Sequence, residues 1–149
     1  MKMSSASPPT TTFRVLLVDD NKHGLAVRKS LLEDAGYCVT ACVVPEQALQ
    51  QFAGSTFDLV ITEYRMPNMP AGEIIQQIKQ IRPAVPIIVI SALVEVLGLT
   101  EKNTGANIVI AKTSTEVNHL IRAVGKLVQG HTPKKPLRSQ VRARVAKSG

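Results

Sequence analysis

The chain has 149 residues, of which 44% are hydrophobic and 19% charged. This is enough apolar material for one folded domain, and it excludes a chain that is disordered by composition. No apolar run approaches the roughly 20 residues that a membrane-spanning helix needs, and residues 1–12 lack the apolar segment of a secretory signal. The sequence therefore predicts a cytoplasmic protein without membrane contact.

The net charge of +7 is concentrated at the two ends of the chain. Residues 14–128 contain 11 acidic and 11 basic residues, so this stretch is neutral. The excess consists of Lys2, Lys134, Lys135, Arg138, Arg142, Arg144 and Lys147. We predict a disordered N-terminal segment (1–12), a folded domain (13–129) and a basic, disordered tail (130–149). Because the tail lacks aromatic residues, nucleic-acid binding is not its expected role, although a weak, salt-sensitive contact stays open.

Five short runs rich in β-branched residues predict strands, at residues 14–19, 37–43, 58–62, 86–91 and 107–111. Four of them are apolar almost throughout, which is typical of strands buried on both faces of a parallel sheet. Cys38 and Cys42 lie on the second strand, about 13 Å apart. That separation exceeds the roughly 7 Å limit for a disulfide, so we expect two buried free thiols.

The segments between the strands have helical periodicity. In the first, Val27, Leu31 and Ala35 predict the buried face, and Gly36 predicts a left-handed residue at the end of the helix. Pro45 predicts the start of the second helix. The third helix has a stripe of Ile74, Ile78 and Ile81.

The fourth and fifth helical segments differ in clarity. The fourth, about 94–103, is weak because Gly98 costs about 1 kcal/mol relative to alanine. Its apolar residues predict either core or an exposed interaction patch; they are Leu93, Val94, Val96, Leu97 and Leu99. The stripe of the fifth helix is the clearest and consists of Val117, Leu120, Ile121, Val124 and Val128.

Alternating strands and helices predict a doubly wound sheet, whose functional crevice lies at the carboxyl ends of the strands. The polar residues there are Asp19, Asp20, Glu63, Ser91 and Lys112. No glycine-rich loop follows the first strand, which disfavours a dinucleotide or P-loop site. Carboxylates suit Mg²⁺, and a hydroxyl and a lysine beside them suit acyl-phosphate chemistry.

Four stretches in this order resemble the receiver domain of two-component response regulators. They are Val15-Leu16-Leu17-Val18-Asp19-Asp20-Asn21, the run from Phe57 to Met69 that contains Met66-Pro67, Ile88-Val89-Ile90-Ser91-Ala92, and Gly105-Ala106-Asn107 leading to Lys112. The resemblance covers residues 13–129. It implies a flavodoxin-like fold, a doubly wound five-stranded parallel sheet of strand order 2-1-3-4-5 with helices on both faces.

The resemblance also implies a metal site. Asp19 and Asp20 match the acidic pair that holds Mg²⁺, and the backbone carbonyl of Arg65 matches a further ligand. Glu63 would supply a third carboxylate from the phosphoacceptor position, three residues before Met66. Binding of Mg²⁺ through Asp19, Asp20 and Glu63 stays possible in this chain, and we expect it to be weak or absent.

The same substitution decides the expected chemistry. In the family, Ser91 matches the switch hydroxyl and Lys112 matches the lysine that contacts the phosphoryl group. The carboxylate of Glu63 reaches further than that of aspartate, and a misplacement of about 1 Å can cost a hundredfold in rate. We therefore predict that Glu63 is not phosphorylated and that the chain is not an enzyme. Two interpretations stay open: the Glu63 carboxylate mimics the phosphorylated state, or the site is inert.

Three further residues depart from the family pattern. Val109 replaces the usual aromatic residue that moves on activation, Thr113 replaces the proline after the lysine, and Ala71 replaces a common glycine. An aromatic switch at position 109 is therefore excluded.

The predicted function is that of a stand-alone, atypical receiver that acts by protein docking, a pseudo-receiver in two-component phosphorelay signalling. The expected partners are a sensor histidine kinase or a downstream signalling protein, or a second copy bound through the face of the fourth helix, fifth strand and fifth helix. Two alternatives are a conventional phosphorelay receiver that accepts phosphate from a histidine kinase, and a module that binds nucleic acid through its basic tail.

Overall fold

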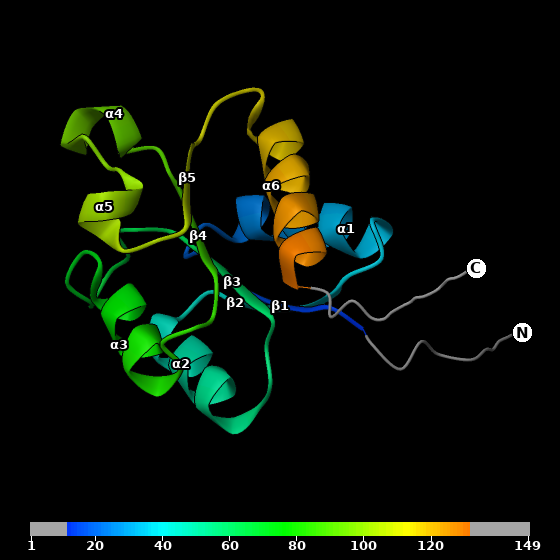
Figure 1. Cartoon of the computed structure of the whole chain (residues 1–149). Helices are drawn as coiled ribbons and strands as arrows, with labels where there is room; N and C mark the ends of the chain where they lie inside the picture. Colours follow the sequence, from blue (N-terminus) through cyan, green and yellow to red (C-terminus); the bar gives the residue numbers. More distant parts are fainter. Residues whose placement is uncertain (1–11, 132–149) are drawn as a thin grey trace, which may run out of the picture. The chain divides into compact units, whose positions relative to one another are not determined.

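The computed structural model describes residues 12–131, which form a five-stranded parallel sheet with helices around it (Figure 1). The elements are β1 (Arg14–Val18), α1 (Lys22–Asp34), β2 (Cys38–Cys42), α2 (Pro45–Gly54), β3 (Leu59–Thr62), α3 (Glu73–Ile81), β4 (Ile87–Ser91), α4 (Val94–Leu97), α5 (Glu101–Thr104), β5 (Ile108–Ala111) and α6 (Glu116–His131). The strand order β2-β1-β3-β4-β5 confirms the prediction. None of the described helices is long and apolar enough to cross a membrane.

The chain divides into two compact units, Met1–His119 and Leu120–Gly149. All five strands, α1 to α5 and the first residues of α6 belong to the first unit, and the rest of α6 belongs to the second. The predicted N-terminal segment and basic tail lie outside the described residues, except for Thr12 and the last two residues of α6.

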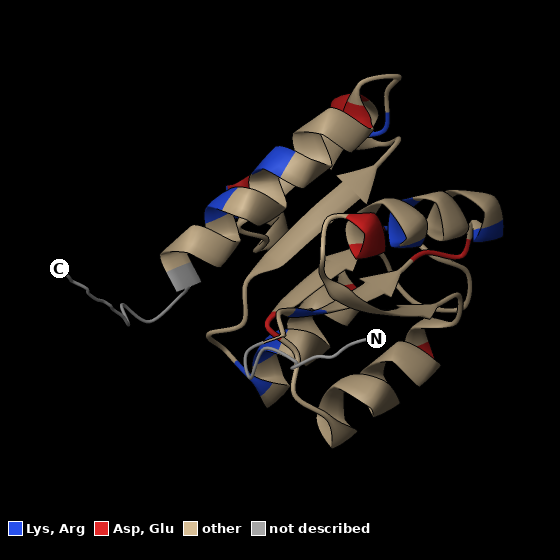
Figure 2. Ribbon diagram, turned by 90° about the vertical axis from the view of Figure 1, so that its right-hand side faces the viewer, with Lys and Arg blue, Asp and Glu red and all other residues tan. Residues whose placement is uncertain are grey.

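The core of the first unit lies on the sheet. Apart from Arg14, the strands contain no charged residues (Figure 2), and β1, β3 and β4 are almost completely buried. Leu16 and Val18 of β1 belong to the same buried cluster as Phe52 of α2 and Ile78 of α3. Helix α1 lies on the opposite face of the sheet from α2 and α3 (Figure 1).

The register of the strands aligns their carboxyl ends. Val18 of β1 is paired with Thr62 of β3, and Ser91 of β4 with Ala111 of β5. The residues that follow these ends therefore emerge at one edge of the sheet, as expected for a parallel arrangement.

The predicted buried face of α1 is wrong. Val27 is 41% exposed, and the residues buried on this helix are Leu25, Arg28 and Leu32. The helix turns an arginine inward because that side chain has buried ionic partners, described below. The predicted end of the helix is confirmed, since Gly36 adopts a left-handed φ of 101°.

The stripe predicted for α3 holds only in part. Ile74 and Ile78 are buried together with Ile75, whereas Ile81 at the last position of the helix is 42% exposed.

The single helix predicted over 94–103 is replaced by the two short helices α4 and α5. Gly98 ends α4 in a left-handed conformation, with φ of 61°. Thr100 starts α5 through a capping box with Asn103, so two local signals divide the segment. Its apolar residues are divided as well: Leu99 is buried, and Val96 is exposed.

The two cysteines are free, as predicted, but only Cys42 is buried. Cys38 is exposed because it begins β2, one of the two edge strands of the sheet. Burial raises the pKa of the Cys42 thiol.

Candidate functional site

Three side chains that follow aligned strands meet at the carboxyl edge of the sheet. Asp19 follows β1, Glu63 follows β3 and Lys112 follows β5. The Nζ atom of Lys112 lies 2.8 Å from Oδ2 of Asp19 and 2.8 Å from Oε1 of Glu63. Both carboxylates are buried. The lysine ammonium therefore bridges two acids that would otherwise repel each other.

The Glu63 carboxylate has partners on both oxygens. While Oε1 contacts Lys112, Oε2 accepts hydrogen bonds from the backbone N–H groups of Tyr64 at 2.8 Å and Arg65 at 3.4 Å. Its own backbone N–H donates to the carbonyl of Val18, which fixes the start of the loop to β1. The side chain is consequently held in one orientation, toward the lysine.

The Asp19 carboxylate also has three partners. Its Oδ1 atom accepts from the backbone N–H of Asn21 at 2.9 Å, and its Oδ2 atom contacts Nη1 of Arg28 at 3.3 Å in addition to Lys112. Two cations thus converge on one oxygen atom.

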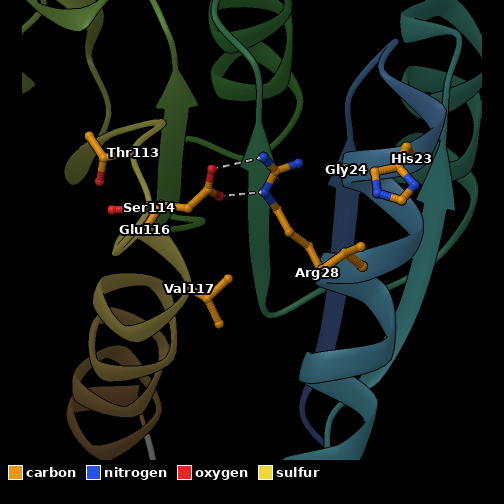
Figure 3. A pocket seen from close by; sticks show the side chains of 8 residues that line it. His23, Gly24, Arg28, Thr113, Ser114, Glu116 and Val117 are labelled. Carbon is orange, nitrogen blue, oxygen red and sulfur yellow. Dashed lines mark hydrogen bonds and ion pairs between the residues drawn. The ribbon is translucent and has the colours of Figure 1, made fainter.

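Arg28 in turn forms a two-point ion pair with Glu116, the first residue of α6 (Figure 3). Arg28 Nε lies 2.8 Å from Oε2 of Glu116, and Nη2 lies 3.2 Å from Oε1. The side chains are 8% and 13% exposed. Neither residue is among the site residues predicted from the sequence. One signal was available for Arg28, which lies three positions after Leu25 and four before Leu32, on the face that is buried.

These contacts join into one line of alternating charges, Glu63, Lys112, Asp19, Arg28 and Glu116, which we call the ion-pair chain. Burial disfavours the charged form of Lys112, but hydrogen bonds and charge attraction from Asp19 and Glu63 outweigh this effect and raise its pKa above the usual value. The lysine is therefore a stable ammonium ion at neutral pH.

Ser91 lies at the end of β4, fully buried, but its hydroxyl has a different partner. The Oγ atom accepts a hydrogen bond from the backbone N–H of Leu93 at 3.0 Å. Within residues 12–131, no hydrogen bond joins this hydroxyl to Glu63 or Lys112. Its backbone carbonyl accepts from the N–H of Lys112, which ties β4 to the start of the last loop.

The predicted magnesium ligands are not gathered as a set. Asp20 is exposed and takes no part in the ion-pair chain, and Arg65 contributes a backbone N–H to Glu63. In the part of the chain that the structure describes, no group of three or more His, Cys, Asp or Glu side chains is placed to hold a metal ion. Lys112 lies between Asp19 and Glu63, and Arg28 also contacts Asp19, so both buried carboxylates already have cationic partners. The ligand set stays a prediction from the resemblance.

A pocket of about 280 Å³ lies beside the ion pair of Arg28 and Glu116 (Figure 3). It lies between the first turns of α1 and the loop that leads from β5 into α6. Its lining consists of His23, Gly24, Val27, Arg28, Thr113, Ser114, Glu116 and Val117.

Comparison with known proteins agrees with this geometry. The family model of the response regulator receiver domain matches residues 15–125. The chain is 33% identical over 78 residues to the transcriptional regulatory protein ZraR of Escherichia coli, covering 52% of this chain and 18% of that protein. It is 29% identical over 128 residues to the gliding motility regulatory protein of Myxococcus xanthus, covering 81% of this chain and 16% of that protein. The chain thus spans less than a fifth of these relatives.

A solved structure resembles the fold over most of its length. The response regulator protein TrrA of Thermotoga maritima, in complex with Mg²⁺ and BeF, matches with a TM-score of 0.70 and 26% identity. The match covers 78% of this chain and 99% of that one. Receiver domains of this kind are signalling modules and typically bind Mg²⁺ at the phosphorylation site. From the family model, the strand order and the residues at the strand ends, we conclude that the chain belongs to the response regulator receiver domain family.

Proposed function

We propose that the chain is a receiver module that signals by docking to other proteins, without a cycle of phosphorylation at Glu63. The observation that carries this proposal is that both oxygens of the Glu63 carboxylate already have partners. One oxygen contacts the ammonium of Lys112, and the other accepts two backbone hydrogen bonds.

Phosphoryl transfer to a carboxylate requires one oxygen to attack the phosphorus in line with the leaving group. Attack by either oxygen of Glu63 would weaken its existing contacts to Lys112 or to the backbone N–H groups. Charge-assisted contacts of this kind are about twice as strong as neutral hydrogen bonds. The side chain is also one methylene longer than aspartate, so an attacking oxygen would be misplaced in the crevice. Both effects oppose modification of this residue.

The ion pair between Glu63 and Lys112 supports a module that stays in a single state. In this proposal, the Glu63 carboxylate stays permanently paired with Lys112. In the family, the matching lysine contacts the phosphoryl group, which is transient. The Ser91 hydroxyl is bonded to Leu93, so the mimicry of the phosphorylated state extends to the lysine and not to the hydroxyl. The docking surface would then be constant.

The partner class in this proposal is a sensor histidine kinase or a downstream signalling protein. The family's partners support this class, and two relatives are named as regulatory proteins. The exposed Val96 and Leu97 of α4 are candidate contact residues for a partner or a second copy. That the module acts without an attached output domain stays a prediction from the sequence.

The test is the intact mass of the protein after incubation with a small-molecule phosphodonor and Mg²⁺. We expect no phosphoryl group on the wild type. Glu63→Asp asks whether the length of this side chain accounts for the loss, and Glu33→Asp, at the exposed end of α1, is the matched control. Gain of a phosphoryl group by the wild type would overturn the proposal, and mapping the modified carboxylate would then favour a conventional phosphorelay receiver.

A further inference from the structure

Arg28 is a buried cation inside the candidate site, and nothing in the family pattern quoted above calls for it. Its side chain is 8% exposed, and its guanidinium contacts Asp19 and Glu116. We propose that Arg28 and Lys112 together take the place of the divalent cation, so that the buried carboxylates Asp19 and Glu63 have this chain's own side chains as cationic partners. The inference deepens the proposed function, on which it rests.

Asp19 is already in contact with two cations. Lys112 Nζ and Arg28 Nη1 approach the same oxygen, at 2.8 and 3.3 Å. The other oxygen accepts from a backbone N–H. A divalent ion at this carboxylate would have to displace one cation and would be repelled by the other, at distances where like charges interact strongly.

The guanidinium of Arg28 is held in one position by its neighbours. Glu116 fixes the guanidinium by two parallel contacts, the geometry that makes arginine–carboxylate pairs strong and directional (Figure 3). Gly24 provides the space, because a Cβ atom at this position would lie 2.9 Å from Nη1 of Arg28. A glycine within a helix costs about 1 kcal/mol relative to alanine, and here its lack of a side chain admits the arginine.

The predicted carboxylate ligands leave Mg²⁺ no alternative site beside the two cations. Glu63 is bound to Lys112 and to backbone N–H groups, and Asp19 is bound to both cations. Asp20 is the one member of the predicted set whose carboxylate is outside the ion-pair chain, and it is exposed. A single exposed carboxylate is a poor site for Mg²⁺, which is usually held by several oxygen ligands.

The experiment is thermal unfolding of the full chain in MgCl₂ and in NaCl of equal ionic strength. Arg28→Met removes the cation but keeps an apolar stem of similar length. Lys29→Met is the matched control, because it removes the same charge from the next residue of α1, where the side chain is exposed. Glu116→Gln is a second variant that keeps the shape of residue 116 and removes the charge that holds Arg28.

We expect the melting temperatures of the wild type and of Lys29→Met to be equal in the two salts. That of Arg28→Met should be higher in MgCl₂ by about 5 °C, when Mg²⁺ is present at roughly ten times its dissociation constant. Glu116→Gln should show a smaller shift in the same direction. The proposal is overturned if the wild type shifts as much as Arg28→Met, or if no shift occurs in the folded variants of Arg28 and Glu116.

The two proposals fail separately. A wild-type chain that takes up a phosphoryl group but has the same melting temperature in the two salts would overturn the proposed function. It would support the proposal that Arg28 and Lys112 take the place of the divalent cation. A wild-type chain that stays unmodified but binds Mg²⁺ would support the proposed function and overturn the built-in cations.

Discussion

The replacement of Lys112 by methionine tests the ion-pair chain directly. The variant keeps most of the apolar stem and removes the ammonium, which makes two contacts of 2.8 Å with buried carboxylates. Breaking a buried ion pair by removing one partner typically costs about 3–5 kcal/mol. Asp19 retains Arg28, and Glu63 retains two backbone N–H groups. We therefore expect a loss near the lower limit, about 3 kcal/mol of unfolding free energy at neutral pH.

The assay is urea unfolding followed by circular dichroism, with Lys29→Met as control. Lys29 and Glu33 also lie 2.8 Å apart, but their side chains are 41% and 43% exposed. Exposed pairs of this kind contribute about 0.3–0.5 kcal/mol to stability. The ion pairs of Lys112 and of Lys29 therefore have the same N–O distance and differ in burial. Equal losses of unfolding free energy in Lys112→Met and Lys29→Met would refute the reasoning that burial strengthens the ion-pair chain.

The pH dependence of the same variant gives a second check. Because the pKa of Lys112 is raised in the folded state, its stabilising contribution is complete below the lysine pKa of the unfolded chain and disappears as the pH rises through the folded value. The difference between wild type and Lys112→Met should therefore persist at neutral pH and shrink at strongly alkaline pH. Other lysines and tyrosines titrate in both proteins, so the difference isolates this residue. A difference that grows at alkaline pH would show that the sign is wrong.

Three further predictions concern the site and its surroundings. Glu63→Asp combined with Arg28→Met should take up a phosphoryl group faster than Glu63→Asp alone, because the shorter acceptor and the removed cation act together; equal rates in a mass time course would contradict this. Asn21→Ala should cost about 1 kcal/mol in urea unfolding, because Oδ1 of Asn21 accepts from the N–H of Gly24 at the start of α1. A thiol reagent should label exposed Cys38 in the folded protein and Cys42 only after unfolding, because burial shields the latter and raises its pKa; equal labelling by mass would contradict the described burial.

The sequence alone predicted the sheet and part of the site for physical reasons. Apolar runs of β-branched residues define buried parallel strands, and the polar residue after each strand must emerge at one edge. This rule predicts that Asp19, Glu63 and Lys112 lie at one edge of the sheet, and the structure joins the three side chains by ion pairs. Their roles in the site stay a prediction.

Arg28 and Glu116 were missed because their positions depend on each other. A charged residue in a helix is usually solvated, so periodicity placed the buried face of α1 on Val27, which is exposed. The inward turn of Arg28 requires a carboxylate 88 positions later in the chain. No local pattern can show such a distant partner.

The exposure of Cys38 was also missed, because the sequence does not show whether other residues cover a side chain on an edge strand.

The ion-pair chain has a consequence for the order of folding. Asp19 and Lys112 are 93 positions apart, and Arg28 and Glu116 are 88 positions apart. Because contacts between such distant segments require closure of long loops, we expect them to form late in folding. Interactions absent from the transition state affect the unfolding rate and leave the folding rate nearly unchanged. We therefore expect the ion-pair chain to affect how long the folded domain persists more than how quickly it forms.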